Sequence, residues 1–361
     1  MNITTALNQR SFLIPRADFV SGSQESLIKL IFARHGEKIV TKIKLIDEND
    51  DYDSFLVEVF DKGFCLKISF DQVPIFYDFM ILKGIEHLEI APQAVDRNEI
   101  EYGKTIYYTI QTFEYSENLL NLGGSAILDE QYSYFNNIVS RMHFYEPPKE
   151  IWPHLDDTKS YLEYQNINFE NILSYVDSGE EDEFEFAKSM YAEIFFEMMS
   201  IFEKNESSLK LKKLVHGNLD LSTIINNNNS FKFINFENAF VGSPFFDLAN
   251  LAFELQMTGL KEYDFVTKRI RDIKLVQNRL KAGEFLNEYK ICKQIWNRKK
   301  LLDLMKDYVK EIIVMNSSRV DKIARLSSDF SNHFYRFSEI EAFQKNKEFF
   351  VQRFSELILN K

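Results

Sequence analysis

The sequence predicts an α+β protein with two lobes, a small lobe built on an antiparallel β-sheet and a larger, mainly helical lobe. The first third of the chain is rich in short β-type runs separated by polar turns, whereas helical periodicity dominates from residue 128 onward. A β-hairpin pattern interrupts this helical part at residues 211–236. We therefore expect residues 1–115 to form the first lobe and residues 116–361 the second.

The elements of the first lobe follow from runs of β-branched and aromatic residues that polar turns separate. One helix is expected where Ile75, Phe79 and Leu82 recur at helical spacing, with Pro74 near its first turn, where the missing N–H costs little. The predicted strands are 30–32, 39–46, 55–60, 64–69, 94–102 and 105–114, and the predicted helix is 73–85.

The second lobe begins with amphipathic patterns that predict helices at 128–144 and 184–202. Between them, the run DSGEEDE at 177–183 predicts a solvated acidic loop. The asparagines at 226–229 predict the turn of the hairpin, and residues 245–361 are expected to be helical again.

Composition limits the classes of partner. The net charge is −12 and the acidic residues are spread along the 361-residue chain, so we expect neither nucleic acid nor a membrane as partner. Cys65 and Cys292 are far apart in sequence and read as reduced, buried thiols, which favours a cytoplasmic location. The first sixteen residues lack the pattern of a signal peptide, and no window has the twenty apolar residues of a membrane-spanning helix.

The most informative stretch is HGNLDLSTII at 216–225, followed by FINFENAFVGSPFFDLA at 233–249. It resembles the catalytic core of the aminoglycoside phosphotransferase and choline kinase family, which has a protein-kinase-like fold. The family pattern runs His-Gly-Asp, four residues, Asn, a hairpin, Ile-Asp-aromatic, and a Gly-x-Pro…Asp-Leu-Ala tail. The resemblance implies a bilobal kinase-like fold, with this degenerate hairpin region at 214–249 in the second lobe. The matching positions are His216, Gly217, Gly242, Pro244 and Asp247.

Three positions that carry the chemistry of the family have changed. The resemblance places Asn218 at the base aspartate, Thr223 at the metal-binding asparagine and Asn235 at the metal-binding aspartate. Phosphoryl transfer needs a carboxylate near the substrate hydroxyl and hard oxygen ligands that hold Mg²⁺ on the nucleotide phosphates. An amide does not accept a proton near neutral pH, and losing a general base costs about 10²–10⁴ in rate. The resemblance therefore implies a pseudokinase without catalytic residues and without a metal site.

In the first lobe, residues 54–69 resemble the two strands that end in the family's phosphate-positioning lysine, here Lys67, and Asp78 aligns with its ion-pair partner. Lys67 either binds a phosphate or pairs with Asp78 as a relic that holds the lobes together. The connection at 47–53 carries five acidic residues and no glycine, so it is expected to repel phosphate.

Four further residues have two interpretations. His216 and Asp247 are expected to support the loop structurally, although a histidine in this motif also suggests catalysis. Asp220 is either a solvated loop acid or a displaced base or metal ligand. Glu237, which follows Asn235 and Phe236, is a candidate carboxylate ligand for a cation.

The leading hypothesis is thus an inactive binding or scaffolding module that lacks a cofactor, apart from weak ATP binding without Mg²⁺. One alternative is a divergent ATP-dependent phosphotransferase that acts on a small hydroxylated molecule through Asp220 or Glu237. Another is a structural component of a larger assembly, for instance a viral particle. The sequence does not identify the protein partner or small ligand.

Overall fold

The structure is a computed structural model of the chain. It describes residues 22–36, 39–48, 52–113, 118–119, 132–145, 155–173, 181–227, 230–254, 268–269, 282–313, 333–334, 336–348 and 351–352. Two compact units are present, and each is described by itself. The sheet unit comprises Met1–Leu155 and His216–Ala239, and the helical unit comprises Asp156–Val215 and Phe240–Lys361. The predicted boundary after residue 115 stays a prediction.

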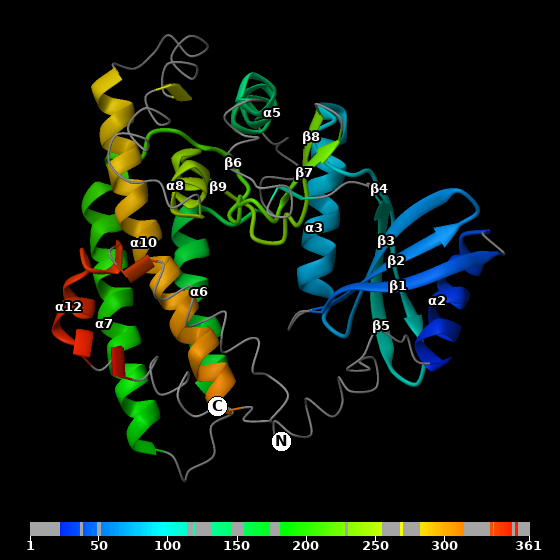
Figure 1. The fold of residues 1–361 in the computed structure, drawn as a ribbon, viewed down its shortest axis with the longest axis horizontal. Coiled ribbons are helices and arrows are strands. Elements are labelled where there is room, and N and C mark those ends of the chain that lie inside the picture. The colour runs from blue at the N-terminus through cyan, green and yellow to red at the C-terminus, as the bar shows by residue number, and fades with distance from the viewer. Residues whose placement is uncertain are drawn as a thin grey trace. The chain divides into compact units, whose positions relative to one another are not determined.

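The sheet unit contains a five-stranded antiparallel sheet with the order β1-β2-β3-β5-β4, which confirms the predicted α+β class (Figure 1). Side chains alternate between its faces along each strand, so Leu66 and Ile68 face one way and Lys67 the other. The predicted runs from residue 39 onward coincide with these strands to within a few residues. The strands are β1 Val40–Glu48, β2 Asp53–Val59, β3 Lys62–Ser69, β4 Ala94–Glu101 and β5 Thr105–Thr112.

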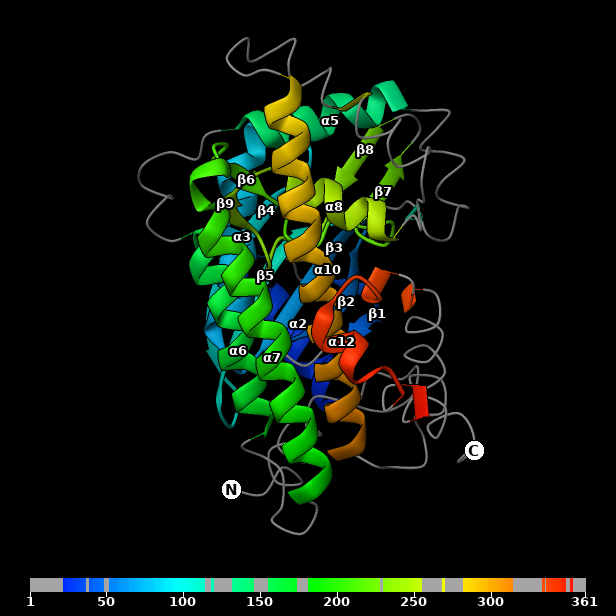
Figure 2. The ribbon, with the colours of Figure 1, turned by 90° about the vertical axis from the view of Figure 1, so that its left-hand side faces the viewer.

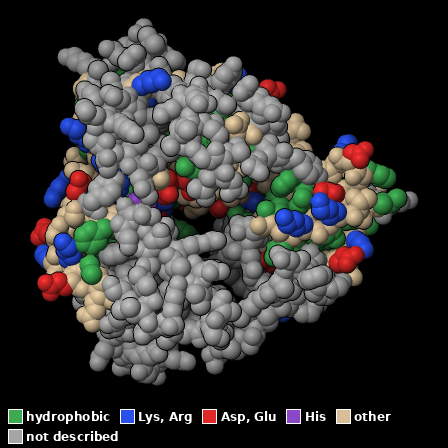
Figure 3. All heavy atoms as spheres, viewed as in Figure 1, with side chains coloured by type: hydrophobic (Ala, Val, Ile, Leu, Met, Phe, Trp, Pro, Cys, Tyr) green, Lys and Arg blue, Asp and Glu red, His purple; other side chains and the backbone are tan. Residues whose placement is uncertain are grey.

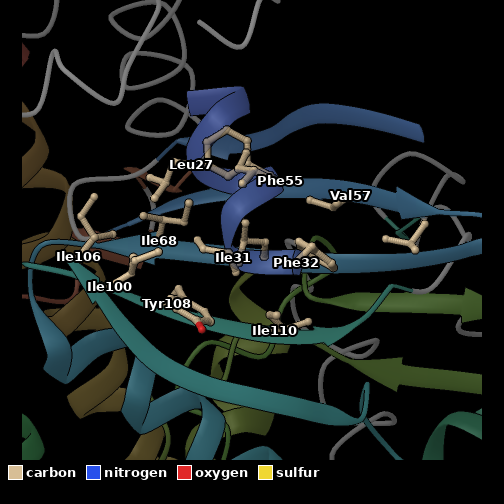
Figure 4. Packing of buried hydrophobic residues seen from close by; sticks show 13 residues of the cluster. Leu27, Ile31, Phe32, Phe55, Val57, Ile68, Ile100, Ile106, Tyr108 and Ile110 are labelled. Atoms are coloured by element: carbon tan, nitrogen blue, oxygen red, sulfur yellow. The ribbon is translucent and has the colours of Figure 1, made fainter. Parts of the chain in front are cut away.

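The predicted strand at 30–32 is wrong, because these residues belong to helix α2, Gly22–Arg34. Leu27, Ile28, Ile31 and Phe32 are buried at a spacing that lines one side of a helix, and the apolar triplet alone hides that period. Figure 4 shows Leu27, Ile31 and Phe32 against Phe55, Ile68, Tyr108 and other residues of the sheet. The core of this unit therefore lies between α2 and one face of the sheet.

The opposite face of the sheet carries helix α3, Gln72–Ile85, followed by the short helix η1, Glu86–Leu88. Lys67 points to this side, since its ammonium contacts Asp78 of α3. The α3 helix was expected, but the expectation of a single helix on the sheet is wrong, because α2 and α3 both pack on it.

The hairpin of the sheet unit consists of β7, Ile224–Asn227, and β8, Ser230–Phe233, as the sequence predicts. Its turn at 228–229 lies outside the described residues. The backbone N–H of Phe233 donates to the carbonyl of Ile90 at 2.8 Å, which fixes the hairpin beside the residues after α3. Helix α5, Tyr132–Phe144, packs on it through edge-on contacts of Phe135 with Phe231 and Phe233.

The helical unit is built on α6, α7 and α10, which run side by side (Figure 2). Residues 181–183, expected in a loop, form the first turn of α7, whereas residues 177–180 lie outside the described part. A two-stranded sheet, β6 with β9, completes the unit. Its elements are α6 Thr158–Leu173, α7 Glu181–Asn205, η3 Glu206–Ser208, β6 Lys213–Val215, β9 Phe240–Gly242, α8 Phe245–Glu254, α10 Ala282–Ile313 and α12 Glu341–Lys345.

The described surface mixes charges of both signs, and in the view of Figure 3 basic and acidic side chains are interspersed. Within the described residues, every helix is too short or too polar to cross a lipid bilayer. Both cysteines are buried and carry free thiols, as predicted.

Candidate functional site

The sheet unit brings together most of the residues that the family pattern singles out. Lys67 lies on β3, Asp78 on α3, and the loop from His216 to Thr223 precedes the hairpin, whose second strand leads to Asn235 and Glu237. These elements are distant in sequence, and their contacts are described below. The predicted roles of these residues toward nucleotide or metal stay predictions.

Lys67 and Asp78 form a buried ion pair with 2.7 Å between Nζ and Oδ2, and both side chains are at most 2% exposed. Burial alone would lower the pKa of Lys67, but the carboxylate of Asp78, with smaller contributions from Tyr52 and Glu237, raises that pKa well above its ordinary value. Lys67 is therefore a permanent cation. The shorter side chain of an aspartate suffices for this pair.

Asp78 has a second role, because its other oxygen, Oδ1, accepts the backbone N–H of Phe236 at 2.9 Å. One residue earlier on α3, the hydroxyl of Tyr77 donates to the carbonyl of Ala239 at 2.7 Å. These two bonds fasten α3 to the segment that follows the hairpin. Together with the Lys67 ammonium on Oδ2, the N–H of Phe236 satisfies both oxygens of the Asp78 carboxylate, which is shielded from water.

Three further groups surround the ammonium of Lys67. The amide oxygen of Asn235 lies 3.3 Å from Nζ, the hydroxyl of Tyr52 lies 3.4 Å away, and a carboxylate oxygen of Glu237 lies 3.8 Å away. Nζ also lies 4.6 Å from the centroid of the Tyr52 ring, within the range of a cation–π interaction. Side chains of the protein thus enclose the charge of Lys67.

Asn235 occupies a left-handed backbone conformation, with φ of 65°. Asparagine tolerates this conformation better than most residues with a Cβ atom, because its short polar side chain bonds locally. Its Oδ1 faces the ammonium of Lys67. The residue at the family's metal-binding aspartate position therefore accepts a hydrogen bond from a cation of the protein itself.

Glu237 is the carboxylate that the described part of the site leaves least satisfied. Oε1 accepts a hydrogen bond from the Tyr52 hydroxyl at 3.2 Å, whereas the buried Oε2 has no hydrogen-bond donor among the described residues. Burial raises the pKa of Glu237, and the nearby charge of Lys67 offsets this only in part.

His216 holds the loop to the hairpin. Its Nδ1 accepts the backbone N–H of Asn218 at 3.3 Å, so Nε2 carries the proton and donates to the carbonyl of Ile234 at 2.9 Å. The ring is fully buried and lies 4.5 Å from the ring of Phe236. This geometry supports the structural interpretation of His216 rather than the catalytic one.

Position 217 requires glycine both because of its backbone conformation and because a neighbouring backbone segment lies too close for a side chain. Its φ is 77°, and a Cβ atom at this position would lie 1.9 Å from the carbonyl oxygen of Asn238. No side chain fits there without moving the backbone.

The loop after Gly217 uses its polar side chains internally. Oδ1 of Asp220 accepts the backbone N–H groups of Ser222 and Thr223, at 2.8 and 3.0 Å, and the hydroxyl of Ser222. The hydroxyl of Thr223 accepts the N–H of Asp220 at 3.0 Å and donates toward the carbonyl oxygens of Asn218 and Asp220. Thr223 is 2% exposed. Both side chains stabilise the loop, which supports the interpretation of Asp220 as a loop acid.

The residues present do not fit a bound Mg²⁺. The amide oxygen of Asn235 faces Lys67, and the hydroxyl of Thr223 is engaged within the loop, so Glu237 is the remaining carboxylate at these positions. Among the described residues, no group of three histidine, cysteine or acidic side chains has the arrangement of a metal site.

Two predicted features lie elsewhere. Asp247 is in the first turn of α8 in the helical unit and is fully buried, while its predicted anchoring of the loop stays a prediction. In the acidic connection, residues 49–51 lie outside the described part, as do the side chains of Asp47 and Glu48.

Tyr52 is the site residue that the sequence did not suggest. It directly precedes β2, and its partner Glu237 is 185 residues away in sequence. A signal was available, since an aromatic residue directly before the first strand of the lysine-bearing hairpin stands close to Lys67 once the strands pair.

The sequence matches no protein-family model and no curated protein. Solved structures are similar to it in fold. The apo form of a thermostable mutant of the aminoglycoside phosphotransferase APH(4)-Ia superposes with a TM-score of 0.53 at 13% identity, covering 79% of this chain and 94% of that one. Ethanolamine kinase from Plasmodium vivax gives a TM-score of 0.60 at 11% identity, covering 83% and 87%.

Choline kinase LicA from Streptococcus pneumoniae gives a TM-score of 0.53 at 14% identity, covering 85% of this chain and 98% of that one. Each of these similarities extends over most of both chains. At such low identity they establish architecture rather than activity. The chain therefore has the kinase-like fold of aminoglycoside phosphotransferases and of choline and ethanolamine kinases.

Proposed function

We propose that this chain is a pseudokinase, a kinase-like protein that serves as a binding or scaffolding module and does not transfer phosphate. The observation that carries the proposal is the contact between Asn235 and Lys67. At the position where the family places an anionic metal ligand, a neutral amide accepts a hydrogen bond from the protein's own lysine at 3.3 Å. This contact satisfies the side-chain oxygen of Asn235 without a metal ion.

The loop supports the same conclusion. Thr223 stands at the second metal position, and its hydroxyl is engaged by the backbone of the loop, so it is not directed to an external ion. Asn218 stands at the base position, and an amide lacks the proton affinity that a general base needs near neutral pH. Three losses in one site remove both charge neutralisation and proton transfer.

A second candidate is a divergent phosphotransferase that acts on a small hydroxylated molecule. One observation favours it: within the described part of the chain, Oε2 of Glu237 is buried without a hydrogen-bond donor, and the ion pair of Lys67 with Asp78 is intact. Spectinomycin phosphotransferase APH(9)-Ia, which has been solved with ADP and spectinomycin, shares this fold at a TM-score of 0.57 and 11% identity. A single carboxylate is a weak ligand set for Mg²⁺, which prefers several hard oxygens in octahedral geometry.

Calorimetric titration of ATP with and without Mg²⁺ separates the two candidates. The pseudokinase proposal predicts that the metal does not strengthen ATP binding, whether that binding is weak or absent. If Mg²⁺ tightens ATP binding tenfold or more, and Glu237→Gln removes that gain, the phosphotransferase candidate replaces the proposal. Asp220→Asn is the matched control, since it removes a carboxylate that the loop uses internally.

A further inference from the structure

The hydrogen bonds of the Lys67 ammonium are complete. An ammonium group has three N–H donors and no acceptor. The structure gives it three acceptors, Oδ2 of Asp78 at 2.7 Å, Oδ1 of Asn235 at 3.3 Å and the hydroxyl oxygen of Tyr52 at 3.4 Å. A phosphate oxygen can bind this lysine only by replacing one of them.

Asp78 and Asn235 lie in segments that further hydrogen bonds fix, and the Tyr52 hydroxyl also donates to Glu237. Asp78 also accepts the N–H of Phe236, and the backbone of Asn235 is fixed between that residue and Ile234, whose N–H donates to the carbonyl of Thr223 at 3.0 Å. The contact with Tyr52 is the longest of the three. An incoming group that replaces Tyr52 leaves the buried ion pair with Asp78 and the contact with Asn235 intact.

The Tyr52 side chain occupies the position beside the Lys67 ammonium where a ligand group would bind. Its ring covers Nζ at 4.6 Å from the centroid, and its hydroxyl accepts from Lys67 while donating to Oε1 of Glu237 at 3.2 Å. A phenol is suited to this position, because it has one donor and an acceptor and is neutral. A phosphate brings further negative charge beside Asp78 and Glu237, and it has no proton to spare for Glu237 at neutral pH.

We propose that Tyr52 determines which ligands the Lys67 site accepts: its side chain fills the phosphate position and thereby selects against ligands that carry phosphate groups. The proposal rests on the proposed function as a binding module and deepens it. It implies that the ligand that this site takes in the wild-type chain is an uncharged molecule, such as a nucleoside, rather than a nucleotide. Removing the phenol frees one donor of Lys67 and the space in front of it.

The test is a titration of ADP, inorganic tripolyphosphate and adenosine, in EDTA, into the wild-type chain and into Tyr52→Ala. We expect Tyr52→Ala to bind ADP and tripolyphosphate at least tenfold more tightly than the wild type, with the affinity for adenosine unchanged within a factor of three. Tyr52→Phe is the matched control, because it keeps the ring over Lys67 and loses only the hydroxyl. Its gain for ADP is expected to be smaller.

The double variant Tyr52→Ala/Lys67→Met shows whether the gain acts through Lys67, and it should return the ADP affinity to the wild-type level. Equal ADP affinity of the wild type and Tyr52→Ala contradicts the proposal, as does an equal gain for adenosine or no binding of ADP by any variant. Thermal unfolding monitors each variant, and Tyr52→Leu replaces Tyr52→Ala if the alanine variant does not fold. Failure of the proposed function itself would appear separately, as tightening of ATP binding by Mg²⁺ in the wild type.

Discussion

The carboxylate of Asp78 lies 2.7 Å from the ammonium nitrogen of Lys67, and both groups are almost completely shielded from solvent. This pair joins α3 to the central strand β3, and through Phe236 it reaches the segment after the hairpin. In an active kinase such a pair positions phosphate, whereas here its geometry supports the idea that it holds the sheet unit together.

Removing one partner of this pair should destabilise the chain strongly. Asp78→Ala leaves a buried ammonium without its counter-ion, and we expect the free energy of unfolding to fall by about 3–5 kcal/mol. Urea denaturation measures this loss of unfolding free energy. The control is Glu58→Ala, which breaks the exposed ion pair with Lys42 and should cost under about 1 kcal/mol. Similar losses of unfolding free energy in both variants would show that the buried pair stabilises the chain no more than the exposed pair does.

Gly217 should tolerate no side chain. Gly217→Ala places a Cβ atom 1.9 Å from a backbone oxygen, whereas Gly103→Ala has a similar φ of 74° and open space around it. We expect Gly103→Ala to cost about 1–2 kcal/mol from conformation alone, and Gly217→Ala to cost clearly more or to prevent folding. Thermal and urea unfolding of both variants decide this, and equal costs would mean that the contact with Asn238 relaxes easily.

Thr223 should act through its hydroxyl. Thr223→Val keeps the shape of the side chain but leaves the N–H of Asp220 and a loop carbonyl without their partner, at an expected cost of about 1–3 kcal/mol. Thr223→Ser keeps the hydroxyl and should cost less than half as much. If valine and serine are equivalent in urea unfolding, the hydroxyl does not hold the loop.

The stability should depend on pH through Glu237. Folding raises the pKa of Glu237 above the ordinary value of 4.5. The contribution of Glu237 to the free energy of unfolding is therefore fully present below pH 4.5 and is lost as the carboxyl ionises at higher pH. Glu237→Gln cannot ionise. The free energy of unfolding of Glu237→Gln should therefore increase relative to that of the wild type as the pH rises from 4.5 to 7.5. A constant difference over this range, or one of opposite sign, would contradict the burial of this charge.

Much of the fold was predictable because its signals are local. Alternating runs identified the strands of the sheet, and the helical spacing of Ile75, Phe79 and Leu82 identified α3. The α2 helix was missed because three apolar residues at 30–32 resemble a strand when the buried Leu27 and Ile28 are left out of the pattern. Short apolar runs do not distinguish the two structures.

Only the site residues that the family pattern includes, or that lie next to it in sequence, were predictable from the sequence. That pattern singled out Lys67, Asp78 and Asn235, and Glu237 was noted two residues after Asn235; the structure brings these four residues into one cluster. It did not include Tyr52, whose place beside Lys67 follows from the pairing of β2 with β3 but whose bond to Glu237 joins residues 185 positions apart. Nor does a sequence show that the hydroxyl of Thr223 turns back into its own loop.

The most direct test of the account is whether the chain turns over Mg·ATP. Formation of ADP should be measured under single-turnover conditions for the wild type, for Lys67→Met and for Asn218→Asp, with several small hydroxylated acceptors. Because amides and a hydroxyl occupy the positions of metal ligands and base, all three proteins should match the background without protein. ADP formation by the wild type that Lys67→Met abolishes, or that Asn218→Asp accelerates, would contradict the account.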